Sequence, residues 1–312
     1  MSFSSEIKLE LVHQTGNARH CQLAELAALV SSCGQFSIRR GGRLFLLVQS
    51  ENLLVVRKAA ILIRRAFGTQ PEVSVLGNGD WKKGRLYTLA LLDPEQVNRV
   101  LRALKMLSSR GALRDPELPV NGILLQSTCC RRAFLRGAFI GTGSLSDPRK
   151  SYHLEIVCAF PEKAEQIRDV IRSFEIDARI VPRKKAFVVY VKESDGIADF
   201  LNVTEAHQGL MNLENIRILR GISGNVNRSV NCETANLNKT VSAAVEQIRC
   251  IEKIQAAGGF STLPQSLREM AQVRLDNPDT PLKDLGLLLD PPVGKSGVNH
   301  RLRRLVEIAE NL

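Results

Sequence analysis

The sequence predicts an α+β protein: a pseudo-two-fold, duplicated αββαββα domain followed by an all-α domain with a helix-turn-helix. Three observations predict it: an internal repeat, strand pairs with turn residues in both copies, and a series of short amphipathic helices near the C-terminus. The predicted domains are residues 1–220, with repeats about 15–110 and 125–215, a polar linker at 221–240, and a helical domain at 241–312. The helix-turn-helix within the helical domain spans about 264–312.

The repeat has an offset of 109 residues, at which Leu26 matches Leu135 and Gly34 matches Gly143. Strands predicted at 43–48 and 152–157 begin at the same offset, whereas the partner strand expected at 36–40 has no clear counterpart in the second copy. The remaining elements of the two copies are helices 53–67 and 162–174, hairpins 72–76 with 85–91 and 178–181 with 186–191, and closing helices 94–107 and 196–207.

Small residues spaced four apart predict how the first helices of the two copies meet. Gly137 and Gly141 fall on one helix face, and Ala28 and Ser32 repeat this spacing in the first copy. Because small side chains let two helix backbones approach closely, these helices are expected to cross at the pseudo-dyad.

The stretch Leu135 to Gly143 resembles the motif that names the LAGLIDADG homing endonucleases. In that family two such helices pack together, and an acidic residue at the eighth position of each holds a catalytic divalent metal through hard oxygen ligands. Those positions are Cys33 and Thr142 here, and neither is a carboxylate. The resemblance therefore implies a LAGLIDADG-like fold that has lost its catalytic positions, with no catalytic residues and no cleavage.

The cysteines indicate neither a metal site nor a disulfide framework. Their number is seven, which is odd, and no CxxC pair occurs. Adjacent Cys129 and Cys130 are not expected to bind one ion together. We predict reduced, buried thiols, no metal and no cofactor in a cytoplasmic protein. No apolar run approaches the ~18 residues of a membrane span, so no membrane partner is expected.

The net charge makes nucleic acid the first partner to consider, and the expected partner is double-stranded DNA; a basic surface that serves only solubility is the alternative. The formal net charge is +11, and residues 1–115 hold 17 Lys and Arg against 9 Asp and Glu. Phosphate contact and solvated hairpin charge are equally good interpretations of the cations near predicted strands. These are Arg39, Arg40, Arg43, Lys82, Lys83 and Arg85 in the first copy, and Arg149, Lys150, Arg183, Lys184 and Lys185 in the second.

The C-terminal region predicts helices at 241–256 and 263–276, a short helix from 281, and a last helix capped by Ser296 and ending at 311. The short helix would bury Leu282, Leu285, Leu288 and Leu289. The outer face of the last helix would carry Lys295, Ser296, Asn299, His300, Arg301, Arg303 and Arg304. Of these, Asn299, His300 and Arg303 are the candidates for reading bases, and Lys295, Ser296 and Arg304 for phosphate contact. An ordinary amphipathic helix with a basic outer face is the alternative.

Residues 277–305 closely resemble the signature of the WhiA family of Gram-positive regulators, and residues 136–144, 152–155 and 227–236 agree with it. The resemblance implies a degenerate LAGLIDADG-like domain joined to a helix-turn-helix of the sigma-factor region 4 kind. It also implies a nucleoid-associated transcriptional regulator of cell division, chromosome segregation and sporulation.

Three functions stay open at this point. The first is a sequence-specific DNA-binding regulator whose duplicated domain adds phosphate contacts or engages another protein regulator. The second is a protein-interaction platform with secondary DNA binding. The third is a metal-dependent DNA endonuclease, against which the residues Cys33 and Thr142 argue.

Overall fold

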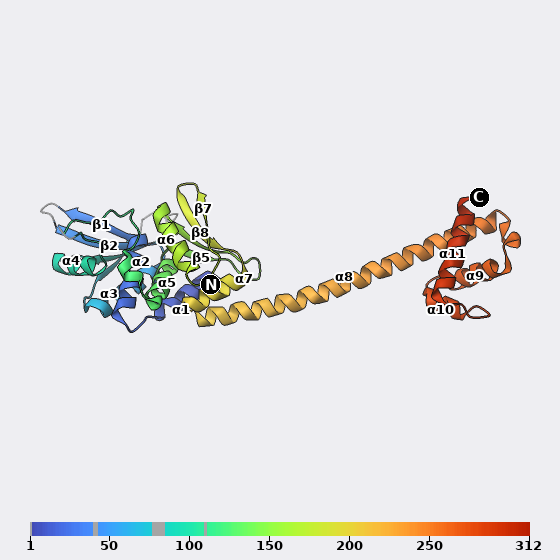
Figure 1. Ribbon diagram of the computed structural model, residues 1–312, viewed down its shortest axis with the longest axis horizontal. Helices are drawn as coiled ribbons and strands as arrows, with labels where there is room; N and C mark the ends of the chain where they lie inside the picture. Colours follow the sequence, from blue (N-terminus) through green and yellow to red (C-terminus); the bar gives the residue numbers. More distant parts are fainter. Residues whose placement is uncertain (1, 40–42, 77–84, 109–110) are drawn as a thin grey trace. The chain divides into compact units, whose positions relative to one another are not determined.

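The computed structural model describes residues 2–39, 43–76, 85–108 and 111–312. It divides the chain into two compact units, Met1–Arg220 and Gly221–Leu312, and helix α8 (His207–Ala256) contributes residues to both (Figure 1). Among the described helices, none is long and apolar enough to cross a membrane.

The first unit confirms the duplicated αββαββα fold, preceded by a helix that the sequence did not predict, α1 (Phe3–His13). The first copy is α2 (Arg19–Cys33), β1 (Gly34–Arg39), β2 (Arg43–Ser50), α3 (Leu53–Phe67), β3 (Glu72–Leu76), β4 (Leu86–Leu91) and α4 (Pro94–Ala103). After a short 3₁₀ helix (Gly122–Leu125), the second copy is α5 (Thr128–Thr142), β5 (Gly143–Leu145), β6 (Leu154–Cys158), α6 (Pro161–Arg172), β7 (Arg179–Arg183), β8 (Ala186–Val191) and α7 (Ser194–Val203).

Each copy forms a four-stranded antiparallel sheet, with strand orders β1-β2-β4-β3 and β5-β6-β8-β7. The counterpart of β1 that the sequence left unclear is β5, which is three residues long and pairs Gly143 with Ile156. In the first sheet Leu46, Val48 and Leu89 are fully buried, as alternation along strands requires. In the view of Figure 1, β1 and β2 lie above α3.

The closing helices are shorter than predicted for the same reason in both copies. Helix α4 ends at Ala103 rather than 107, and α7 ends at Val203 rather than 207. Each is followed by a residue in the left-handed region, Lys105 (φ 57°) and Glu205 (φ 66°). The next amides, of Met106 and Ala206, donate to carbonyls five residues back. This helix ending usually employs glycine, so Lys105 and Glu205 do not mark it in the sequence.

Helices α2 and α5 pack with almost no space between their backbones. A Cβ added at Gly137 would lie 2.4 Å from the carbonyl oxygen of Glu25 and 3.0 Å from Cβ of Ala28. A Cβ added at Gly141 would lie 2.7 Å from Oγ of Ser32. The spacing of small residues therefore has the predicted consequence, and it fixes where the two copies meet.

A buried ionic network surrounds the same pair of helices. The carboxylate oxygen Oε1 of Glu25 lies 2.9 Å from Nζ of Lys58 and 3.1 Å from Nε of Arg136, and all three side chains are at most 3% exposed. Lys58 also donates to the carbonyl oxygens of Leu11 (2.9 Å) and Gln14. The network thus joins α1, α2, α3 and α5 through groups that sequence patterns would place on the surface.

Charge compensation holds this network together. Burial lowers the pKa of Lys58, although Glu25 opposes the shift. Burial alone would also lower the pKa of Arg136, but Glu25 and Glu205 outweigh it, and the pKa is raised. Glu205, whose left-handed backbone ends α7, accepts from Arg136 at 2.6 Å. Each charge is therefore tied to a partner from another element.

The second unit is all-helical. It contains the C-terminal part of α8, a short 3₁₀ helix (Gly259–Thr262), α9 (Gln265–Asp276), α10 (Leu282–Leu287) and α11 (Lys295–Glu310). Its core is built around Ile251, Met270, Leu285 and Leu302, which are fully buried. Lys253 of α8 donates to the carbonyl oxygen of Ala309, 2.8 Å away, and so ties α8 to the end of α11.

The predicted break at 221–240 is wrong, because this polar segment lies inside α8 rather than before a helix that starts at Val241. Its asparagines suggested a linker, but no proline occurs between Pro182 and Pro264. Ile218, Ile222, Val226 and Val230 recur every four residues, which is a helical period. These side chains are exposed, so composition concealed the pattern.

The turn between α10 and α11 depends on Gly286. A Cβ there would lie 2.0 Å from the carbonyl oxygen of Val293, and the Val293 amide donates to the Gly286 carbonyl at 2.9 Å. Two predictions for this region are wrong. Ser296 does not cap α11, because the residue before the first turn is Gly294 and Ser296 lies within the helix. Leu288 is not buried but 55% exposed, because α10 has already ended at Leu287.

We expect Gly137→Ala to destabilise the first unit by about 1–3 kcal/mol, because the new methyl group would meet a backbone carbonyl that cannot rotate away. Gly221→Ala, in the exposed part of α8 where an added Cβ meets nothing within 4 Å, is the matched control. It should be neutral or slightly stabilising. Urea unfolding followed by circular dichroism measures both; equal effects of the two variants would refute the close packing.

We expect Lys58→Met to lower the free energy of unfolding by about 3–5 kcal/mol, because Glu25 and the carbonyl oxygens of Leu11 and Gln14 lose a buried cationic partner. Lys150→Met removes an exposed lysine from the same unit and should have little effect. The same urea titration distinguishes them, and an unchanged midpoint for Lys58→Met would show that the network does not stabilise the fold.

Candidate nucleic-acid interface

Helix α11 presents one apolar and one polar face. Val298, Leu302 and Leu305 are buried against the core of the second unit. On the outer side Lys295, Ser296, His300, Arg303 and Arg304 are exposed, and Asn299 and Arg301 are half-buried. The spacing of Ser296, Asn299 and Arg303 places them on one face of the helix, near its N-terminal half. That half is the part of a recognition helix that meets base edges.

The candidate residues differ in how free their side chains are. Arg304 pairs with Glu307 at 2.7 Å, and Arg301 donates to the carbonyl oxygen of Ser266 over 3.5 Å. Within the described residues, the side chains of Asn299, His300 and Arg303 form no hydrogen bond or ion pair. The three residues proposed for base reading are therefore the ones with unused donors and acceptors.

In the second sheet, the outward cations are accompanied by acids. Arg183, exposed at the end of β7, lies 3.6 Å from Glu155, and the hairpin residues Lys184 and Lys185 are exposed. The register places Arg179 on the same face, opposite Tyr190, and Arg179 pairs with Asp177 at 2.8 Å. The sequence did not single out Arg179. Its spacing of four residues from Arg183, which places both on one face of a strand, could have identified it.

The basic residues of the first copy are described only in part. Arg85 is exposed just before β4. Arg39 and Arg43 end β1 and begin β2, paired with each other in register, while the structure gives no account of their side chains. The predicted contacts at Arg40, Lys82 and Lys83 lie outside the described residues.

The two positions that carry acids in homing endonucleases lie at the C-terminal ends of α2 and α5. Cys33 approaches the carbonyl oxygen of Gly141 at 4.0 Å, and burial raises the pKa of its thiol. Lys8 of α1 faces Cys33, and burial lowers the pKa of Lys8 to about 8. A protonated thiol, a threonine hydroxyl and an amine are not the hard anionic oxygens that magnesium requires. The residues present therefore do not fit a catalytic divalent metal.

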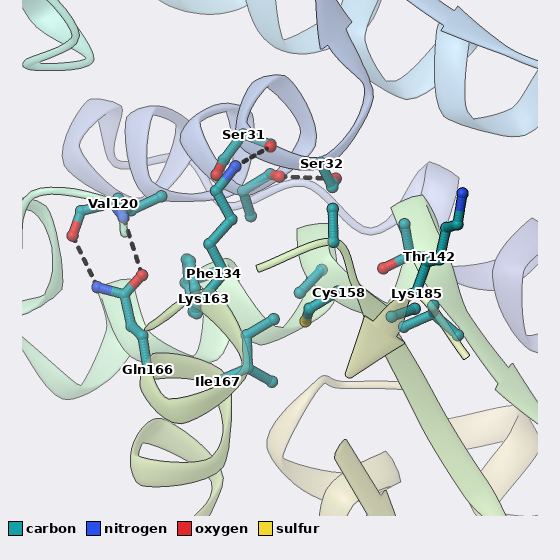
Figure 2. A pocket seen from close by; sticks show the side chains of 15 residues that line it. Ser31, Ser32, Val120, Phe134, Thr142, Cys158, Lys163, Gln166, Ile167 and Lys185 are labelled. Atoms are coloured by element: carbon teal, nitrogen blue, oxygen red, sulfur yellow. Dashed lines mark hydrogen bonds between the residues drawn. The ribbon is translucent and has the colours of Figure 1, made fainter. Parts of the chain in front are cut away.

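A pocket of about 330 Å³ adjoins Thr142, between α2, α5, α6 and the second sheet (Figure 2). Its walls are mostly apolar, and of the described residues that line it none is acidic. Lys163 reaches across to donate to the carbonyl oxygen of Ser31 at 2.8 Å, while Gln166 accepts from the amide of Val120 at 2.9 Å. Lys185 lies near Thr142 on the other side (Figure 2). The pocket adds cations, not metal ligands, to this end of the helices.

The thiols differ from the sequence prediction. Cys21, Cys130, Cys158 and Cys250 are buried, but Cys129 and Cys232 are exposed and Cys33 is half-buried. The structure also brings Cys21, Cys129 and Cys130 together with His20, their ligand atoms all within 4.8 Å of one another. Although Cys129 and Cys130 are adjacent in the sequence, their sulfur atoms both lie close to the same neighbours, which the sequence analysis did not expect.

Comparison with known proteins covers nearly the whole chain. Three family descriptions match: "WhiA N-terminal LAGLIDADG-like domain" at residues 19–107, "WhiA LAGLIDADG-like domain" at 131–223, and "WhiA C-terminal HTH domain" at 226–309. The third match begins inside α8 and includes α9, α10 and α11.

Full-length relatives agree. A protein of Lachnoclostridium phytofermentans named "Probable cell division protein WhiA" is 48% identical over 100% of this chain and 99% of its own length. A protein of the same name from Lachnospira eligens is 46% identical over 100% of this chain and 98% of its own length. The crystal structure of full-length DUF199/WhiA from Thermatoga maritima has a TM-score of 0.60 and 27% identity, and covers 100% of this chain and 99% of that one. The chain belongs to the WhiA family, with a LAGLIDADG-like N-terminal region and a C-terminal helix-turn-helix domain.

Proposed function

We propose that this protein is a sequence-specific, double-stranded DNA-binding transcriptional regulator that does not cut DNA. The observation that carries the proposal is the polar face of α11, on which Asn299, His300 and Arg303 keep unpaired side chains directed away from the core. Asn and Arg can each pair bidentately with one base edge in the major groove, with adenine and guanine respectively.

The duplicated domain has a supporting part in this proposal. Arg183, Lys184 and Lys185 offer phosphate contacts that position the protein without reading bases. Another protein regulator bound through this domain is the alternative use of the same surface. The neighbouring acids Glu155 and Asp177 limit the local positive charge, which favours specificity from α11 over affinity from the sheets.

The biological role within the proposal is regulation of cell division, with chromosome segregation and sporulation where the organism sporulates. The names of the relatives support the first of these. The nucleoid is where such a protein would act, since its partner is duplex DNA.

The full-length protein should retain particular duplexes from a genomic fragment library without cutting them, with or without magnesium. The reason is that Cys33 and Thr142 offer no carboxylate to hold the ion. Bound fragments are sequenced, and their ends are examined for strand breaks on denaturing gels. Magnesium-dependent breaks would mean that the protein is an endonuclease with other ligands, and retention without sequence preference would refute the regulator.

Arg303→Ala should weaken binding to the selected duplex by about 1–3 kcal/mol and relax preference at one base pair, if its contact with guanine is bidentate. Arg249→Ala removes an exposed arginine of the same unit, on α8, and is the matched control. Fluorescence anisotropy on the selected site and on all its single-base variants measures both. An equal loss on every sequence would identify Arg303 as a phosphate contact instead.

A further inference from the structure

Four metal-binding side chains meet where the two central helices begin. His20 and Cys21 are the second and third residues of α2, and Cys129 and Cys130 are the second and third residues of α5. Both pairs are related by the offset of 109 residues, so the pseudo-dyad that relates the helices also relates the two halves of the cluster. The site is thus built equally from both copies.

The spacing of the four ligand atoms fits a single tetrahedral ion. Nδ1 of His20 lies 3.1 Å from Sγ of Cys130, 3.4 Å from Sγ of Cys21 and 4.0 Å from Sγ of Cys129. All four atoms lie within 4.8 Å of one another. In a tetrahedral zinc site, with Zn–S about 2.3 Å and Zn–N about 2.1 Å, ligand atoms are about 3.5–3.8 Å apart. Small side-chain rotations therefore suffice to close the site.

We propose that His20, Cys21, Cys129 and Cys130 bind one Zn²⁺ ion that links the two copies of the αββαββα unit. Three thiolates and one imidazole are a donor set of structural zinc sites, and sulfur-rich sets disfavour magnesium and calcium. Binding releases three thiol protons, and the ion with its ligands carries one net negative charge. His20 would bind through Nδ1 of the imidazole ring.

The surroundings favour that negative charge. The cluster occupies the first turns of α2 and α5, where the partial positive charges of two helices meet, and neither helix has a side chain that caps its N-terminus. Cys21 and Cys130 are buried, whereas His20 and Cys129 are exposed and give an ion access.

The proposed ion differs from the metal of homing endonucleases in place as well as in ligands. Cys33 and Thr142 are the last residues of the same two helices. Cys21 and Cys33 are 12 residues apart on α2, so about 18 Å of helix separates the thiol cluster from the other end. The zinc would therefore act on stability, by closing the start of the seam between the copies, and not on DNA chemistry.

The test uses the full-length, untagged protein purified under reducing conditions, with zinc counted by inductively coupled plasma mass spectrometry. Wild type should retain one zinc per chain. Cys129→Ser, which changes an exposed ligand, should lose it, and Cys232→Ser, which changes an exposed cysteine of the other unit, should keep it. Cobalt(II) added to the zinc-free wild type should give the visible bands of tetrahedral thiolate coordination, which Cys129→Ser should lack.

A thermal melt supplies an independent measurement. Zinc should raise the Tm of the wild type and of Cys232→Ser but not that of Cys129→Ser, because only an ion bound to the native state stabilises it. Circular dichroism shows that each variant is folded. The proposal is overturned if wild type binds no zinc, if Cys129→Ser binds as much, or if peptide mapping shows a disulfide from Cys21 to Cys129 or Cys130 as the resting state.

Discussion

The close contact of α2 with α5 is the constraint on which the first unit depends. Gly137 and Gly141 remove the side chains that would separate the backbones, and Glu25 places a carboxylate on the seam for Lys58 and Arg136 to neutralise. These requirements are stringent, since a single added methyl group would meet a backbone carbonyl and a lost cation would leave buried polar groups with fewer partners. Everything duplicated in the unit, including both sheets, is arranged around this seam.

The two ends of the seam have different chemistry. The C-terminal ends carry Cys33 and Thr142 with cations nearby and no metal-binding acid among the lining residues of the adjoining pocket. The N-terminal ends gather soft ligands from both copies. Packing requirements can therefore preserve the fold although catalytic ligands are missing. In the proposed role, sequence recognition passes to α11, in a separate compact unit.

Periodicity and repetition predicted most of the architecture, because they follow directly from which faces are buried. The helix expected at 53–67 is α3 to the residue, and the order αββαββα is found twice. The predictions that were wrong concern helix ends and helix continuity, for which the local sequence carries weak signals. The ends of α4 and α7 rely on left-handed Lys105 and Glu205 instead of glycine, and α8 continues through a segment whose composition suggested a linker.

Of the candidate sites, the sequence could indicate the one that depends on local helical spacing but not the one that depends on how distant helices pack. The outer face of α11 follows from helical spacing alone, so Asn299, His300 and Arg303 could be assigned to it from the sequence, and base contact by them stays a prediction. The meeting of His20 with Cys130 depends on how two distant helices align, which adjacency in sequence cannot reveal. Gly286 has a consequence for mutational tests of the proposed DNA binding. Because buried Gly286 sets the turn before α11, its substitution would displace that helix and reduce such binding without removing any of the candidate contact residues.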